Sequence, residues 1–92
     1  KLAEILSIQP NPFNDYVEIS YEIFAESVVH LSLHDLSGKL VFTLANELQG
    51  VGTYNYIWYG INNQSVKLPN GVYYVILTVN DEKYIRKLVF NK

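Results

Sequence analysis

The groups in this sequence that could do chemistry are histidine, serine and aspartate side chains, and their spacing does not form a reactive site. The two histidines, His30 and His34, stand four residues apart in a stretch of alternating hydrophobicity. On a strand they would share one face about 13 Å apart, at a rise of about 3.3 Å per residue, which one zinc ion cannot bridge. No nucleophile elbow surrounds any serine. We therefore expect surface histidines, no metal or cofactor, and no enzymatic activity.

An aromatic stripe offers a second kind of site. Tyr54, Tyr56 and Trp58 alternate with Asn55 and Ile57, so the three rings would share one face of a strand. Such rings could stack on sugars, as in carbohydrate-binding sandwiches. The alternative is a core position, because a small sandwich needs a large buried anchor. We favour the core for Trp58.

The elements that must position these residues are strands. Period-two alternation dominates the chain, and no segment has a helical apolar stripe. We expect strands at residues 6–9, 16–23, 28–34, 39–44, 53–59, 72–79 and 83–91, with a loop at 45–52 that could hold one helical turn. About seven short strands at this spacing predict an all-β fold, an immunoglobulin-like antiparallel β-sandwich.

Length and composition fit a single packed domain over residues 1–92. The chain is 49% hydrophobic and 17% charged, with a formal net charge of −2 and no cysteine. These values argue against disorder, and the charge argues against a nucleic-acid partner. Cysteine chemistry and disulfides are excluded. The chain begins at Lys1 rather than Met, so we expect a module of a longer protein.

The order and spacing of several short motifs are more specific to one protein family than any single motif is. They are Pro-Asn-Pro-Phe-Asn at 10–14, Leu-His-Asp-Leu-Ser-Gly-Lys-Leu-Val at 33–41, Gly-Thr-Tyr at 52–54, Trp-Tyr-Gly at 58–60, Asn-Gly-Val-Tyr at 70–73 and Arg-Lys-Leu-Val at 86–89. Over residues 8–92 the chain resembles the type A C-terminal sorting domain of the type IX secretion system. It also resembles the immunoglobulin-like domain of flagellar hook-capping proteins.

The first resemblance implies a cargo signal without catalytic activity or a small-molecule substrate. An upstream cargo domain would enter the periplasm of a Gram-negative bacterium by an N-terminal signal. The sandwich would then be recognised by the outer-membrane translocon. A surface sortase-like peptidase would remove it, leaving the cargo secreted or attached to the cell surface. Two alternatives remain open: a hook-cap-like spacer module, and an accessory sugar-binding module of a secreted hydrolase.

The expected recognition residues lie near the end of the chain. The motif positions are Gly71, Tyr73, Lys87, Leu88 and Val89. A terminal strand at a sheet edge also presents backbone groups that a partner strand can extend. We therefore expect the translocon to bind there.

The outer face of the last two strands is a second candidate surface. If Tyr73 and Val89 point inward, the side chains on the alternate positions form an apolar docking patch. Its members are Tyr74, Ile76, Tyr84, Leu88 and Phe90. Two alternatives are a face covered by a neighbouring domain and a register shifted by one residue, which inverts a strand.

Overall fold

The computed structural model describes residues 1–92 and is built from strands alone. The seven strands are β1 (Ala3–Gln9), β2 (Val17–Ile23), β3 (Ser27–His34), β4 (Leu40–Gln49), β5 (Gly52–Trp58), β6 (Gly71–Val79) and β7 (Glu82–Phe90). All pairs of neighbouring strands are antiparallel. The all-β prediction is confirmed. No helix that could cross a membrane is present.

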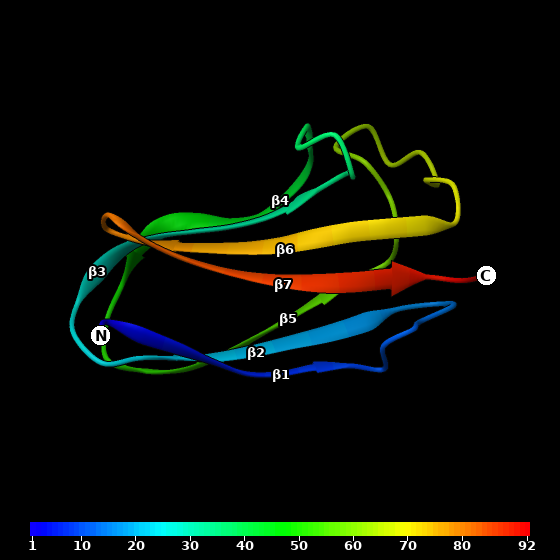
Figure 1. Cartoon of the computed structure of the whole chain (residues 1–92). Helices are drawn as coiled ribbons and strands as arrows, with labels where there is room; N and C mark the ends of the chain where they lie inside the picture. Colours follow the sequence, from blue (N-terminus) through cyan, green and yellow to red (C-terminus); the bar gives the residue numbers. More distant parts are fainter.

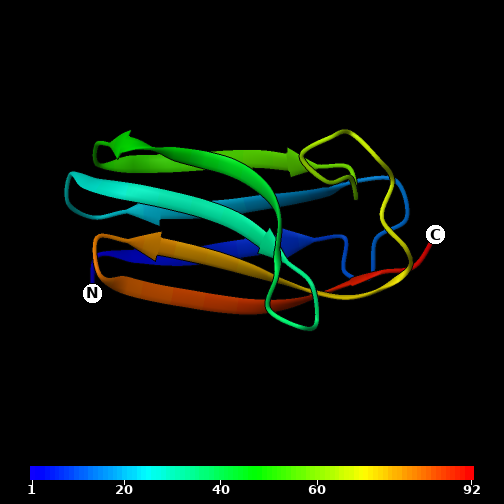
Figure 2. The ribbon, with the colours of Figure 1, turned by 90° about the horizontal axis from the view of Figure 1, so that it is seen from above.

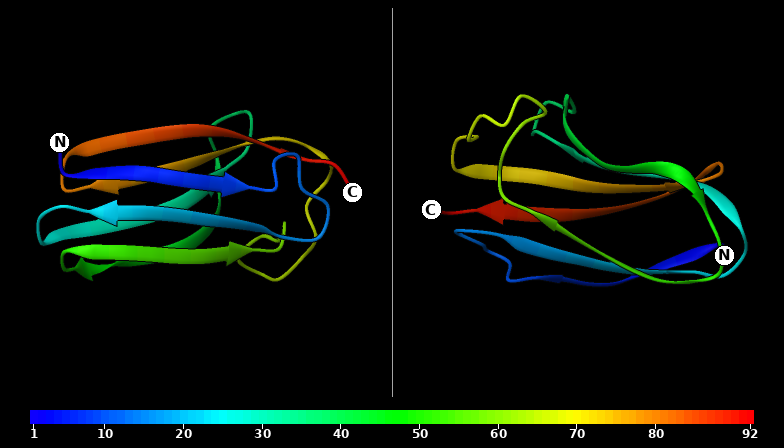
Figure 3. Two further views of the ribbon diagram at one scale, coloured as in Figure 1. Left: turned by 90° about the horizontal axis from the view of Figure 1, so that it is seen from below. Right: turned by 180° about the vertical axis from the view of Figure 1, so that it is seen from behind.

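The strands form two sheets that pack face to face (Figure 1). One sheet has the order β1-β2-β5 and the other the order β4-β3-β6-β7. Figure 2 shows the four-stranded sheet in front, and the left panel of Figure 3 shows the three-stranded sheet. The chain changes sheet after β2, β4 and β5, as in an immunoglobulin-like sandwich. In all of these views β1 and β7 lie on the same side of the sandwich, at the edges of their sheets.

The core lies between the two sheets and follows the expected alternation. In β2 every second residue from Val17 to Ile23 is buried, and β3 buries Val29, Leu31 and Leu33 in the same way. The buried apolar cluster has 17 members. Apolar side chains therefore alternate with polar ones on both strands, which is the pattern of sheets with one solvent-facing side.

Two strands extend beyond their predicted bounds, and bulges explain both differences. β1 begins at Ala3 rather than residue 6, and its register shifts between Ile5 and Ser7. β4 continues to Gln49 where we expected a loop, and its pairing with β3 shifts twice. A bulge inserts one residue and reverses the apolar phase, so alternation cannot be followed through it. Pairing with β3 overrides the weak strand propensity of the Ala-Asn-Glu segment.

Two short turns hold the ends of the four-stranded sheet. In the first, Gly38 N–H donates to Asp35 C=O at 2.9 Å, and Asp35 Oδ1 accepts the N–H and hydroxyl of Ser37. The Ser37 hydroxyl is the main reason that the pKa of Asp35 lies below its usual value. In the second, Asn80 has a positive φ of 52°, and its Oδ1 accepts the N–H of Val28 at 3.0 Å.

Candidate functional site

The expected recognition residues divide between the core and the surface. Tyr73 and Leu88 are directly opposite one another on β6 and β7, and both are buried. Lys87 and Val89 lie on the outer face, exposed and half-buried respectively. Gly71, at the start of β6, is half-buried opposite the buried Phe90. In the folded domain a partner can therefore reach the Lys87 and Val89 side chains, but not those of Tyr73 and Leu88.

On β7 the predicted docking patch is wrong, because the predicted register is shifted by one residue. Leu88 and Phe90 are buried, and Tyr84 is half-buried against the core, so all three point inward. On β6 the expectation holds for Tyr74 and Ile76, which alternate with buried residues. The alternative of a shifted register is the correct one for β7. The apolar side chains that share the outer face are Val72, Tyr74, Ile76, Ile85 and Val89.

Motif residues from distant parts of the chain meet in one aromatic cluster at an end of the sandwich. Phe13 stacks on Phe90 with ring centroids 4.6 Å apart, and its centroid lies 5.6 Å from that of Trp58. Trp58 in turn meets Tyr73 edge to face at 5.7 Å. Gly60 closes the cluster with a φ of +71°, and a Cβ there would lie 2.7 Å from the Phe90 ring. These motifs therefore build the core.

The aromatic stripe on β5 also faces inward. Trp58 is fully buried and donates from Nε1 to a backbone carbonyl, so its predicted core position is confirmed. Tyr54 and Tyr56 are half-buried and stack on Tyr21. The Tyr21 hydroxyl donates to Gln49 Oε1 at 2.8 Å between the sheets. A sugar has no access to the Trp58 ring in this arrangement.

The two histidines lie half-buried on the outer face of β3. His34 Nδ1 is 3.2 Å from the carbonyl oxygen of Gly38, and Nε2 is 2.9 Å from the hydroxyl of Ser32. Both ring nitrogens of His34 therefore take part in local hydrogen bonds.

The free edge of β7 is partly covered by the chain segment that follows β1. Asn11 Nδ2 donates to Lys87 C=O at 3.1 Å, and Asn11 Oδ1 accepts the Val89 N–H at 3.0 Å. Phe13 continues this pairing: its N–H donates to Val89 C=O, and its C=O accepts the N–H of Asn91. The last part of β7 is thus closed to a partner strand, which corrects the expectation that the whole terminal edge is unpaired.

The opposite end of the same edge is closed by the N-terminal residues. The N–H of Leu2 donates to Glu82 Oε1 at 3.1 Å and lies 3.3 Å from the Tyr84 hydroxyl. The Tyr84 hydroxyl also donates to Glu82 and, together with Leu2, holds the pKa of that carboxyl below its usual value. These contacts join the start of β1 to the start of β7.

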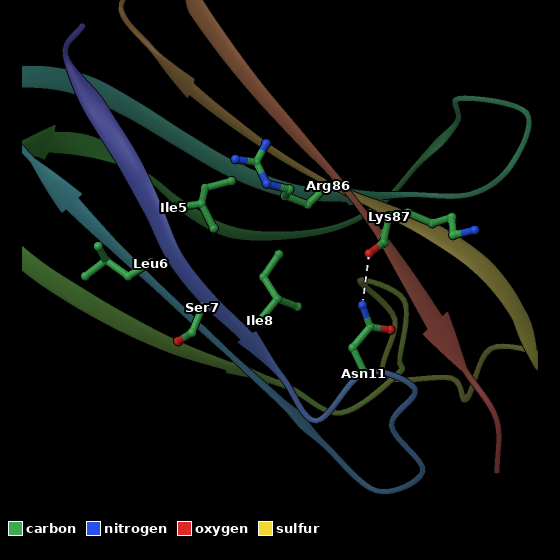
Figure 4. A pocket seen from close by; sticks show the side chains of 7 residues that line it. All are labelled: Ile5, Leu6, Ser7, Ile8, Asn11, Arg86 and Lys87. Carbon is green, nitrogen blue, oxygen red and sulfur yellow. Dashed lines mark hydrogen bonds between the residues drawn. The ribbon is translucent and has the colours of Figure 1, made fainter.

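A groove of about 170 Å³ remains between the two closed ends. It is lined by Ile5, Leu6, Ser7, Ile8, Asn11, Arg86 and Lys87. Figure 4 shows Ile5 and Ile8 reaching from β1 into the space beside β7, with Arg86 extending over Ile5. The Lys87 side chain points to the other side of β7. The groove therefore has an apolar floor, one guanidinium at its rim and no carboxylate in its lining.

Comparison with known proteins gives the family. The sequence profile of the secretion system C-terminal sorting domain matches residues 7–91. The chain belongs to this family. The resemblance to type IX sorting domains is thereby confirmed. A comparison with curated proteins found no match.

The sorting domain also has a structural relative. The crystal structure of dimeric latent PorU from Porphyromonas gingivalis matches with a TM-score of 0.75 and 18% identity. The match covers 96% of this chain and 9% of that chain. At this identity the likeness shows a shared fold. The sorting domain spans about a tenth of the PorU chain that it matches.

Sequence reasoning missed three residues of the site. Asn11 stands between two prolines and gives no sign that its partners lie 76 and 78 residues away. Ile85 and Arg86 depend on the register of β7, which the sequence pattern predicts one residue out of phase. The signal that could have given the correct register lies in the Lys-Leu-Val-Phe run at 87–90. Placing Leu88 and Phe90 inward buries more apolar surface than placing Val89 inward.

Proposed function

We propose that this sorting domain is a non-catalytic signal that directs an attached cargo protein across the outer membrane through the type IX secretion system. The partners would be the outer-membrane translocon and a surface sortase-like peptidase. The product would be a cargo released from the cell or attached to its surface. The family match carries this proposal, because it covers nearly the whole chain.

The position of β7 supports a role for this strand in recognition. It is an edge strand, and its outer face carries Lys83, Ile85, Lys87 and Val89. Lys87 belongs to the recognition motif, is exposed and has no salt bridge. An exposed charge of this kind adds little to the free energy of unfolding. The stability of the fold therefore does not explain why a lysine stands at this position.

The arrangement of the reactive groups supports a non-catalytic role. The nucleophile–base pair with the closest contact is Ser32 and His34, and the other ring nitrogen of His34 meets a backbone carbonyl rather than a carboxylate. The nearby Asp35 carboxylate accepts hydrogen bonds from its own turn. Ser32 is only 1% exposed, so a substrate cannot reach the hydroxyl that lies beside His34.

Fusion to a reporter tests the proposed function. The domain is appended to a periplasmic fluorescent protein that carries an N-terminal signal peptide. We expect the reporter outside the cell in a strain with a type IX system, and in the periplasm of an isogenic strain without the translocon. Periplasmic retention in both strains would contradict the proposal and favour a spacer module.

A matched pair of lysines tests the role of the terminal motif. Lys83 and Lys87 are both exposed on the same face of β7, but only Lys87 belongs to the motif. We expect Lys87→Ala to reduce export of the reporter and Lys83→Ala to leave it unchanged, with both purified variants as stable as the wild type. Deleting residues 90–92 cannot separate signal from fold, because Phe90 is buried and stacked on Phe13.

A further inference from the structure

The seam between the two sheets is closed at both ends and open in the middle. At one end Leu2 donates to Glu82, and at the other Asn11 bonds to the backbone of Lys87 and Val89. No strand pairing joins β1 to β7 between these points. The groove of about 170 Å³ occupies this opening (Figure 4).

Unpaired backbone groups of β7 face this opening. In an antiparallel pair, the N–H and C=O of a residue point to the same side, and this side alternates along the strand. Lys87 and Val89 turn these groups away from β6 and toward Asn11. Ile85, two residues earlier, therefore points its N–H and C=O in the same direction. Its C=O accepts a hydrogen bond from Arg86 Nη1, while the N–H groups of Ile85 and Lys87 face an edge with which no strand pairs.

The lining of the groove defines the chemistry that fits there. Ile5 and Ile8 supply apolar surface on the β1 side, and Arg86 supplies a positive charge on the β7 side. The Glu82 carboxylate at one end of the seam is already bonded to Leu2 and Tyr84. Two backbone N–H donors, an apolar floor and a guanidinium are complementary to an extended backbone that carries an acidic and an apolar side chain two residues apart, on the face turned toward β1.

We propose that the opening binds a short extended segment of a partner protein, in which an acidic and an apolar residue stand two positions apart and face β1, and which adds to the free edge of β7 at Ile85 and Lys87. Its carboxylate pairs with Arg86 and its apolar side chain covers Ile5 and Ile8. The two closed ends limit the length of added strand to a few residues and fix its register. This mode of binding rests on the proposed export function, because it supplies the chemistry by which the translocon would recognise β7.

A synthetic peptide tests the proposal with the purified domain. The probe is acetyl-Val-Thr-Glu-Thr-Val-amide, in which the glutamate shares one face with the two valines, and the readout is the amide spectrum and hydrogen exchange of the domain. We expect the Ile85 and Lys87 amide signals to shift and their exchange to slow. A probe with lysine in place of glutamate should bind about tenfold more weakly, because it meets Arg86 with a like charge. No binding at millimolar probe, or perturbation confined to other residues, would overturn the proposal.

Two variants at one position separate backbone recognition from side-chain recognition. Ile85→Ala keeps the outward N–H, whereas Ile85→Pro removes it without removing a bond to β6. Since the net value of a hydrogen bond corresponds to up to about tenfold in affinity, the proline variant should bind about tenfold more weakly than the alanine variant. Equal affinities in two folded variants would overturn strand addition. If the proline variant does not fold, the wild-type domain is titrated with versions of the probe that are methylated on alternate backbone nitrogens. Strand addition is overturned if every methylated probe binds as tightly as the parent probe.

The export assay tests strand addition at β7 separately from the proposed sorting function. If the wild-type fusion is exported and Ile85→Pro is exported equally well, strand addition is wrong and the sorting role stands. If the wild-type fusion is not exported, the sorting role is wrong, while the peptide titration still decides whether the opening binds an extended segment. Export of Ile85→Ala with retention of Ile85→Pro supports both.

Discussion

The carboxamide of Asn11 takes the place of a neighbouring strand beside Val89. Its Oδ1 accepts the Val89 N–H at 3.0 Å, and its Nδ2 donates to the preceding outward carbonyl, that of Lys87, at 3.1 Å. A carboxamide presents one acceptor and one donor side, as a peptide group does, so it can pair with an open strand edge. The corner after β1 thereby protects the last strand against unwanted pairing.

Asn11→Ala should loosen the end of β7. The variant loses two exposed hydrogen bonds, which together contribute about 1–2 kcal/mol to the free energy of unfolding. We expect Tm to fall by about 5–10 °C for a domain of this size. Hydrogen exchange at Val89 should become faster while exchange in β2 stays unchanged.

Asn11→Asp is the matched control for this prediction. The carboxylate still accepts the Val89 N–H, but it cannot donate to Lys87 C=O. Its stability should therefore lie between those of the wild type and Asn11→Ala. If Asn11→Ala leaves both Tm and the exchange of Val89 unchanged, the carboxamide does not hold the edge.

The fold could be predicted from the sequence because most strands are continuous and show clean alternation. β2 from Val17 and β3 from Val29 have an apolar residue at every second position with polar residues between them, and the structure buries the apolar ones. The bounds of β1 and β4 could not be predicted, since bulges change the phase inside each strand. These bulges are set by pairing with distant strands, which the local sequence does not record.

The phase of β7 could not be predicted for a different reason. The strand has apolar residues on both faces, with Ile85 and Val89 outside and Leu88 and Phe90 inside. Alternation alone is then ambiguous, and a shift of one residue inverts the assignment. Contacts with Phe13 and Gly60 decide the phase, because they require Phe90 to point into the aromatic cluster.

Trp58→Ala should unfold the domain or destabilise it severely. Trp58 is fully buried between Phe13 and Tyr73, and truncating a buried aromatic residue costs about 3–5 kcal/mol. Denaturant unfolding of the purified variant measures this loss. Ile57→Ala is the control, because Ile57 is the preceding residue on the same strand and is 44% exposed. An unchanged Tm for Trp58→Ala would show that the ring is accessible and would restore the sugar-stacking hypothesis.

Gly60→Ala should also destabilise the domain, through one specific contact. A Cβ at this position lies 2.7 Å from the Phe90 ring, and the φ of +71° is strained for alanine. We expect a loss of about 1–3 kcal/mol in the free energy of unfolding. Gly50→Ala is the control, since a Cβ there meets no atom within 4 Å.

A second substitution tests the cause of the Gly60 effect. If contact with the ring is responsible, Phe90→Leu and Gly60→Ala should be less damaging together than the sum of their separate effects. Strictly additive losses would show that backbone strain, and not the Phe90 ring, accounts for the cost.

Alkaline pH should destabilise the domain through Tyr21. Burial raises the pKa of this phenol, so the folded state keeps it protonated after the unfolded chain has begun to ionise near its usual value of 10.0. The stabilising effect is therefore complete below pH 10 and is lost as pH rises above it. Urea midpoints measured from pH 8 to 11 should fall at the alkaline end.

Two variants test whether Tyr21 causes this fall. The urea midpoint of Tyr21→Phe should be lower at pH 8, since Gln49 loses its hydroxyl partner, but it should fall less steeply as pH rises. Tyr16→Phe, at a 50% exposed position, should keep the wild-type slope. A wild-type slope in Tyr21→Phe would show that another group causes the alkaline loss.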